Sequence, residues 1–235
     1  MTNAPRVSRM PRQRREQQRA IDTRASILEA ALLEFAQKGF DAASTRAIGE
    51  RAGLVQPLIL YHFGTKDDLW RAVAEDSLGQ IVKMWERIEA ETKDLPPAER
   101  IRSVFRAFFE YTVNHPPLHQ FMLQENLSNS ERLEWLSKNF NRDFVTQVVE
   151  LIRQAQADGE MIEGHPGIIY YMLLGNISIL SSFGKEMRLT IDFAPPDDGI
   201  VDEVWAVIER MLFRLKPTDQ SPAKRLARKS AAVRS

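Results

Sequence analysis

Apolar residues recur every three or four positions along almost all of this 235-residue chain, and that period restricts the fold more than any other feature. Ile27, Ala31 and Phe35 show the spacing in the first such segment. No segment shows the alternation of apolar and polar residues, bounded by tight turns, that a half-buried strand requires. The pattern therefore predicts an all-α fold of about nine helices.

Start and stop signals place these helices along the chain. Asp22 or Thr23 is a candidate N-cap for the first helix, and Gly39 is its candidate C-terminal stop. Gly53 can end the second helix in a left-handed conformation, and Pro57 suits the first turn of the third. We expect helices at about residues 22–39, 44–52, 57–63, 65–88, 101–112, 118–126, 130–158, 166–183 and 201–215.

Charge is distributed unevenly although the formal net charge is zero. Residues 1–20 carry six arginines against one glutamate, and residues 216–235 carry six basic residues against one aspartate. The segment between them holds 20 basic and 30 acidic residues, so two basic tails flank an acidic body. We expect residues 1–20 and 217–235 to be disordered, although arginine-rich arms also reach DNA phosphates or a minor groove.

Several classes of protein are disfavoured by what the sequence lacks. The chain has no cysteine, which removes disulfides and thiolate chemistry. We see no Ser-His-Asp arrangement, glycine-rich phosphate loop or paired-carboxylate motif, so we expect neither catalysis nor a cofactor. The basic N-terminus has no apolar stretch behind it, and the apolar segment 167–183 is too short to span a membrane. We therefore expect a cytoplasmic protein in which this segment is a buried helix.

The second and third predicted helices have the length and turn chemistry of a helix-turn-helix at about residues 44–63. This region and its surroundings, about residues 21–75, resemble the N-terminal domain of tetracycline-repressor-like (TetR-family) transcriptional regulators. The remaining helices agree with that family in number and order. The residues that carry the resemblance are Ile27-Leu28, Ala30-Ala31, Phe35, Gly39-Phe40, Ile48, Ala52-Gly53, Tyr61-His62-Phe63, Lys66 and Leu69.

A candidate DNA-reading surface follows from the third helix. If Ile59 and Phe63 pack inward, the opposite face can read bases: a glutamine amide pairs with adenine, and apolar groups lie against a thymine methyl. Hydroxyl, imidazole and ammonium groups nearby, and the start of the second helix, suit phosphate oxygens. The resemblance implies the same positions. The predicted contacts are Ser44, Thr45, Arg46, Gln56, Pro57, Leu58, Tyr61, His62 and Lys66.

Three features depart from a simple version of this interface. Val55 stands where the family often has a capping Ser or Thr, and Leu60 stands where a Tyr commonly contacts a phosphate, so Tyr61 is expected to replace it. Residues 21–63 hold four basic and five acidic side chains. We therefore infer that the basic arm supplies much of the nonspecific attraction to DNA.

The resemblance assigns residues 66–216 to ligand binding and dimerisation. A mostly apolar cavity among the fourth to eighth helices would favour a hydrophobic or aromatic inducer, and the last two helices would pair across a two-fold axis. The predicted pocket residues are Trp85, Phe105, Phe109, Phe121, Met122, Phe140, Phe144, Tyr171 and Met172. The predicted dimer contacts are Ile168, Met172, Ile179, Val201, Val204, Trp205, Ile208, Met211 and Leu212.

The function expected from these features is a dimeric repressor that binds a pseudo-palindromic operator and is released by a ligand. An activator, or a regulator without a ligand, stays open within the same class. A helical enzyme or metal-binding protein using His115, His119 and His165 is a different possibility, although no carboxylate stands at ligand spacing and we expect no metal. A helical interaction module that no longer binds DNA is a third.

Overall fold

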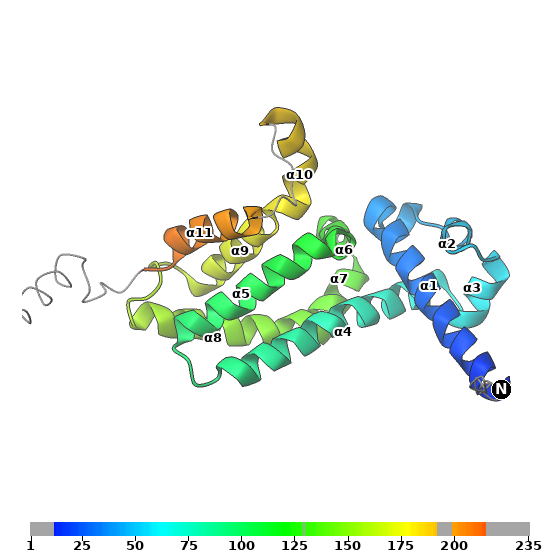
Figure 1. Ribbon diagram of the computed structural model, residues 1–235, viewed down its shortest axis with the longest axis horizontal. Coiled ribbons are helices and arrows are strands. Elements are labelled where there is room, and N and C mark those ends of the chain that lie inside the picture. The colour runs from blue at the N-terminus through cyan, green and yellow to red at the C-terminus, as the bar shows by residue number, and fades with distance from the viewer. Residues whose placement is uncertain (1–11, 129, 192–198, 215–235) are drawn as a thin grey trace, which may run out of the picture. The chain divides into compact units, whose positions relative to one another are not determined.

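The computed structural model describes residues 12–128, 130–191 and 199–214, and within these ranges the chain is almost entirely helical (Figure 1). An isolated antiparallel bridge pairs Met161 with Phe213. The α-helices are α1 (Arg12–Ala42), α2 (Thr45–Ala52), α3 (Gln56–Phe63), α4 (Lys66–Thr92), α5 (Pro97–Asn114), α6 (Pro116–Leu127), α7 (Glu131–Leu136), α8 (Arg142–Ala157), α9 (Pro166–Ile177), α10 (Ile179–Thr190) and α11 (Ile200–Leu212), and a π-helix, η1 (Ser137–Asn141), lies between α7 and α8. The all-α prediction is confirmed.

The chain divides into two compact units. As far as their residues are described, unit 1 consists of Met1–Val82 and His115–Leu136, and unit 2 of Lys83–Asn114 and Ser137–Ser235. This division differs from the boundary expected after residue 65, because α6 packs along α1, and the ring of Trp135 on α7 lies 6.0 Å from that of Trp70 on α4.

Unit 1 is a small core built around α1. This helix packs along α6 and against α2, and α2 in turn packs on α3. Aromatic side chains join α4 to α6, since the rings of Trp70 and Phe121 lie 5.4 Å apart. The largest fully buried side chains of the unit are Ile27, Phe35, Ile48, Ile59, Leu69, Trp70, Phe121 and Leu136.

Unit 2 has a larger apolar core. In it α5 packs against α8 and α9, and α11 covers α9 and α5. Tyr170 is buried at the centre of an aromatic group, with its ring 6.0 Å from Phe105 and 6.2 Å from Phe144. Burial raises the pKa of its phenol far above the ordinary value.

The first helix differs from the prediction at both ends. It begins at Arg12, so the expected disorder is wrong for residues 12–20, which are rich in good helix formers and contain no Gly or Pro. Gly39 has the left-handed φ of 71° that we expected, but it kinks the helix, which continues to Ala42. Residues 1–11 and 217–235, also expected to be disordered, lie outside the described residues.

Two of the nine predicted helices are each divided into two α-helices, so the described residues contain eleven α-helices instead of nine. The predicted helix 130–158 is divided into α7, η1 and α8. The apolar helix after Pro166 breaks at Ser178, whose hydroxyl donates to the Leu174 carbonyl. No single described helix is both long and apolar enough to cross a membrane, but α9 and α10 pass that test together as a pair bent by 44°.

Candidate DNA-binding site

The helix-turn-helix is held by its caps and by a close backbone approach. Ser44 caps α2, since its hydroxyl accepts a hydrogen bond from the Ala47 amide at 3.1 Å. Gly53 ends the helix with a φ of 68°, as the sequence predicted. The Leu54 amide then donates to the Gly49 carbonyl at 2.8 Å. A Cβ on Gly49 would lie only 2.8 Å from the Leu54 carbonyl oxygen, so the turn requires glycine there.

The faces of α3 agree with the predicted division into a packed and an open side. Ile59 and Phe63 are buried. Gln56, Pro57, Leu60 and Tyr61 are exposed, whereas Leu58 and His62 are half-buried. Tyr61 is 83% exposed, although its ring stacks edge-on against His62 with centroids 5.6 Å apart. An apolar and aromatic surface is therefore exposed at the positions where the sequence predicted base contacts.

Gln56 is oriented by a side chain of the preceding helix. Its Nε2 donates to the Thr45 hydroxyl at 2.9 Å. The amide keeps its other N–H and its Oε1, which are the donor and acceptor that a glutamine uses to recognise adenine. Thr45 therefore orients the Gln56 side chain, a role that the sequence did not reveal.

The start of α2 carries the other two predicted phosphate contacts. Ser44 is exposed, and its hydroxyl can still donate while its oxygen caps the helix. Arg46 is exposed but forms an ion pair with Glu50 at 3.0 Å. Binding a phosphate would therefore exchange one anion for another at Arg46.

Lys66 has a different role from the predicted phosphate contact. Its ammonium donates to the carbonyls of Phe40, Asp41 and Ala43 at 2.9, 3.3 and 3.0 Å. All three of its protons are engaged, so the prediction for Lys66 is corrected to a structural one. The lysine closes the C-terminal end of α1, where unpaired carbonyls and the helix dipole favour a cation.

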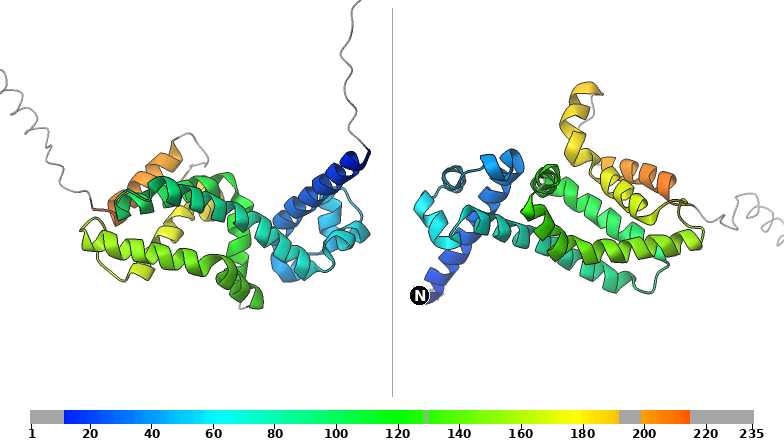
Figure 2. Two further views of the ribbon diagram at one scale, coloured as in Figure 1. Left: turned by 90° about the horizontal axis from the view of Figure 1, so that it is seen from below. Right: turned by 180° about the vertical axis from the view of Figure 1, so that it is seen from behind.

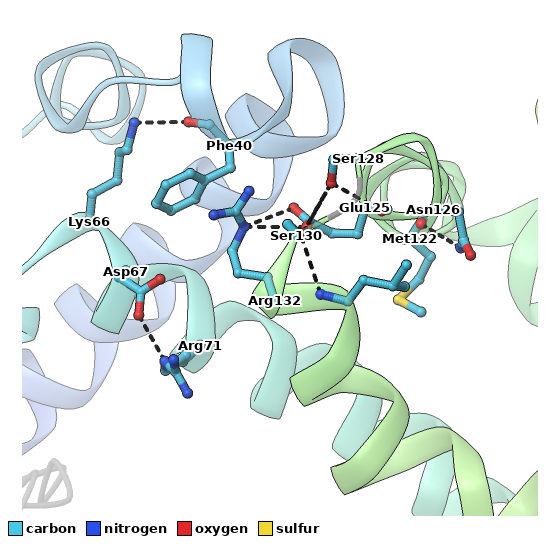
Figure 3. A network of polar contacts seen from close by, with 11 residues as sticks. Phe40, Lys66, Asp67, Arg71, Met122, Glu125, Asn126, Ser128, Ser130 and Arg132 are labelled. Carbon is cyan, nitrogen blue, oxygen red and sulfur yellow. Dashed lines mark hydrogen bonds and ion pairs between the residues drawn. The ribbon is translucent and has the colours of Figure 1, made fainter.

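A polar network connects α6 and α7 to the same end of α1 (Figure 3). Glu125 is buried, and it accepts hydrogen bonds from the Ser130 hydroxyl at 3.0 Å and from Arg132 Nε at 3.3 Å. The Arg132 guanidinium lies 3.8 Å from the centre of the Phe40 ring, and Lys66 Nζ lies 4.5 Å from it. Two cations from α4 and α7 thus hold the residue that precedes the helix-turn-helix.

The acidic side chains of unit 1 are partly neutralised by local pairs. Glu34 is buried and forms ion pairs with Lys38 at 2.8 Å and Arg51 at 3.3 Å. Burial alone would raise the pKa of Glu34, but the hydrogen bonds and charges of these two partners outweigh burial and lower it.

Arg24 lies 4.5 Å from the centre of the Phe63 ring, next to the end of α3, and is a basic residue that periodicity did not single out.

The predicted pocket residues do not all come together. Trp85, Phe105 and Phe109 are buried in the core of unit 2, where Phe144 packs against them. Phe121 and Met122 belong to α6 in unit 1, and Tyr171 and Met172 are exposed, so these four are corrected. Phe140 is half-buried in η1. Tyr170, one position before the predicted Tyr171, is buried in this core instead of Tyr171.

The predicted dimer residues are likewise divided between the core and the surface. Trp205, Ile208 and Leu212 are buried in the protein's own core and are wrong as contacts for a partner. Ile179, Val201 and Val204 are half-buried. The helices α9 and α11 lie side by side (Figures 1 and 2). Of the predicted dimer contacts these helices expose Ile168, Met172 and Met211, and they also expose Tyr171 and Val207. These five residues are called the α9–α11 stripe.

The histidines do not form the alternative metal centre. His115 precedes α6, His119 lies within it, and His165 precedes α9. No group of three or more His, Cys, Asp or Glu side chains in the described part of the chain could hold a metal ion. Burial lowers the pKa of His119, as expected of a packed imidazole.

The fold and this surface define an all-helical protein with a helix-turn-helix unit of the kind that enters the major groove of DNA. The family model "Bacterial regulatory proteins, tetR family" matches residues 27–73, and "Tetracyclin repressor-like, C-terminal domain" matches residues 97–192. The two matches together span more than half of the chain. The protein therefore belongs to the TetR family of transcriptional regulators.

Known regulators and solved structures resemble the chain over most of its length. The HTH-type transcriptional regulator RutR of Escherichia coli strain K12 is 22% identical over 189 residues, covering 80% of this chain and 87% of its own. KstR2 of Mycobacterium tuberculosis superposes with a TM-score of 0.66 at 18% identity, covering 82% of this chain and 95% of its own. AibR, solved with isovaleryl coenzyme A and operator DNA, gives 0.65 at 15% identity, covering 80% and 97%.

Proposed function

We propose that this protein is a dimeric repressor whose two α3 helices read a pseudo-palindromic operator and which a small hydrophobic or aromatic ligand releases. The observation that carries the proposal is the exposed face of α3, with Gln56 oriented by Thr45 and Tyr61 open beside it. Apolar and amide groups held outward on a helix of a TetR-family protein suit base reading. The relative AibR, which was solved with both a ligand and operator DNA, supports the ligand-responsive part.

The two-fold arrangement rests on the α9–α11 stripe. Ile168, Tyr171 and Met172 follow one another at helical spacing, and Gly175, one turn further, has nothing within 4 Å of where a Cβ would stand. An exposed apolar face of this kind on two packed helices favours a four-helix interface with a second copy. The two recognition helices of such a dimer would enter major-groove segments about 34–36 Å apart.

The stripe gives a direct test of the dimer. Tyr171→Glu with Met211→Glu should convert the dimer to a folded monomer with a large loss of operator affinity, because charges would be buried at the interface. The control Gln147→Glu places a charge on an exposed position of α8. Analytical ultracentrifugation measures the assembly; a double variant that stays dimeric would show that the stripe is not the interface.

The ligand is proposed to bind beside the aromatic core of unit 2. Phe105 and Phe144 lie against Tyr170, and Trp85 packs on Phe144. The phenol of Tyr170 is thus a polar group in an apolar setting. Such surroundings suit an aromatic or hydrophobic molecule with one polar group. Release requires the ligand to bind the state that does not fit DNA more tightly, by about 1–3 kcal/mol of coupling. Distance probes on α3 of the two protomers should then report a changed spacing when ligand is added.

The first experiment for this function uses duplex DNA from immediately upstream of the protein's own gene, with a scrambled duplex as control. Operator recognition predicts that the upstream duplex binds about 1000-fold more tightly or better. Reporter transcription from the same duplex then tests the direction of regulation, since a repressor lowers it and an activator raises it. Equal, strongly salt-dependent binding of both duplexes would contradict an operator in that segment.

A further inference from the structure

The N-terminal part of α1 extends well beyond the core that the rest of the helix helps to form. The helix begins at Arg12, whereas Ile27 is its first buried residue. The side chains described between residues 14 and 22 are all exposed. At about 1.5 Å per residue, residues 12–22 form an extension of roughly 16 Å, seen as the dark blue end of α1 (Figures 1 and 2).

This extension leaves the core beside the recognition helix. The Arg24 guanidinium lies 4.5 Å from the centre of the Phe63 ring, and Phe63 is the last residue of α3. The residues of α1 that precede Arg24 therefore continue away from the C-terminal end of α3. Duplex DNA that lies on the exposed face of α3 and continues past the C-terminal end of that helix would therefore be next to the extension.

The extension carries a row of positive charge. Arg15 and Arg19 lie four residues apart and so share one helical face, with Arg14 a quarter-turn or more away. Within the described part of the chain, Arg14, Arg15 and Arg19 form no ion pair. Of the acidic residues in the extension, Asp22 accepts a hydrogen bond from Gln18 at 2.8 Å.

The helical conformation decides which part of DNA these arginines can reach. A helix with its side chains is about 10–12 Å across, whereas the minor groove of B-DNA is only about 6 Å wide. The extension therefore cannot enter a minor groove as an extended arm does. A rigid row of arginines next to an occupied major groove instead faces the phosphates that border it.

We propose that the face formed by Arg15 and Arg19 binds backbone phosphates of duplex DNA that flank the groove occupied by α3. This inference rests on the proposed function and adds a sequence-independent contact to it. Helix formation before binding fixes the spacing of the guanidinium groups, so less conformational entropy is lost when they bind. The contact compensates for a helix-turn-helix whose own charges are balanced by Glu34 and Glu50.

The experiment measures how the binding constant of the full-length protein depends on salt, for an operator duplex and for a scrambled duplex. The variant Arg15→Gln with Arg19→Gln removes two cations from each protomer. Each phosphate contact contributes about 0.9 to the slope of log K against log salt concentration, so the slope should fall by about 3.6 for a dimer. The fall should be equal on both duplexes, and the ratio of the two affinities should stay unchanged, because phosphates carry no sequence information.

Two further variants test the location and the helical form. Arg142→Gln with Arg153→Gln changes the charge equally on α8 in unit 2, and the slope should stay at the wild-type value. Gln18→Pro keeps every arginine but interrupts the helix, so its slope should fall toward that of the Arg15, Arg19 variant. Circular dichroism should show an unchanged melting temperature for all three, because the side chains of residues 14–22 and those of Arg142 and Arg153 are exposed.

The outcomes separate this inference from the proposed function. A wild-type slope in the Arg15, Arg19 variant would overturn the phosphate contact. A wild-type slope in Gln18→Pro together with a lowered one in the Arg15, Arg19 variant would overturn the helical mode in favour of a flexible arm. If the wild-type protein fails to distinguish any candidate operator from scrambled DNA, the proposed function fails instead, whatever the slopes are.

Discussion

The helices α2 and α3 and the helices of unit 2 are held in place by different interactions. Each of the two short helices buries only two residues, and their geometry depends on a cap at Ser44, a close backbone approach at Gly49 and the carbonyl contacts of Lys66. Unit 2 is held by a continuous apolar core that includes Phe105 and Phe109. Substitutions in α2 and α3 should therefore change DNA recognition through local geometry, whereas substitutions in the core of unit 2 should change stability through packing.

The largest expected effect is a loss of stability in unit 2. Phe109 is fully buried in the core, and Phe109→Ala should lower the free energy of unfolding by about 3–5 kcal/mol through lost burial and the cavity it leaves. Chemical denaturation measures the change. Under conditions where the variant is folded, its operator affinity should be that of the wild type; a loss of stability below 1 kcal/mol would contradict the packing account.

A smaller change in energy should abolish recognition in unit 1. Gly49→Ala places a methyl group 2.8 Å from the Leu54 carbonyl, which should cost about 1–3 kcal/mol and displace the turn before α3. Gly79→Ala is the matched control, because nothing lies within 4 Å of the added Cβ on α4. The control should gain up to about 1 kcal/mol and bind DNA normally. Thermal unfolding and operator binding together test the pair; normal binding by Gly49→Ala would count against it.

The cap of α2 should contribute less. Ser44→Ala removes the acceptor for the Ala47 amide and should lower stability by about 1 kcal/mol. Ser44→Asp restores the acceptor and should recover that stability while weakening DNA binding, because a carboxylate repels phosphates. Denaturation and binding measurements on both variants check this. Equal DNA binding by the aspartate variant would show that α2 begins away from the phosphates.

The smallest expected effect is a pH dependence in unit 1. The pKa of Glu34 lies below its ordinary value of 4.5 in the folded protein, so folding favours the charged carboxylate. Its contribution is complete at neutral pH and is lost as the pH falls through 4.5 toward the lower folded pKa. The difference in unfolding free energy between the wild type and Glu34→Gln should therefore be largest near pH 7 and shrink below pH 4.5. A constant difference would contradict the assigned ion pairs.

The sequence predicted unit 1 more closely than unit 2 for a physical reason. Caps and turns act over a few residues, so Ser44, Gly53 and Pro57 could be recognised in one dimension. The faces of α3 followed from the helical period alone. The period could not show that Lys66 reaches back to carbonyls more than twenty residues earlier, because nothing local distinguishes it from a lysine that faces a phosphate.

Outside the helix-turn-helix region, the helical period of apolar residues could not show which helices pack against each other. An apolar stripe shows that a helix is packed but not which neighbour it packs on. Phe121 and Met122 were therefore predicted to line a pocket together with residues of unit 2, although both belong to unit 1. On α11 the period predicted an apolar face, yet Trp205 and Ile208 turn inward while Val207 and Met211 remain exposed. That helix is apolar on two sides, and only the three-dimensional structure distinguishes its core side from its open side.

The most direct test of the central claim is the ratio of affinities for operator and scrambled duplexes in the variant Gln56→Ala with Tyr61→Ala. Both side chains are exposed, so the variant should fold and dimerise normally, as should the control Gln147→Ala on α8. With each base contact contributing about 1–3 kcal/mol, the ratio should fall from about 1000-fold or more toward one in the double variant and stay unchanged in the control. A double variant that keeps the wild-type ratio would show that α3 does not read the operator.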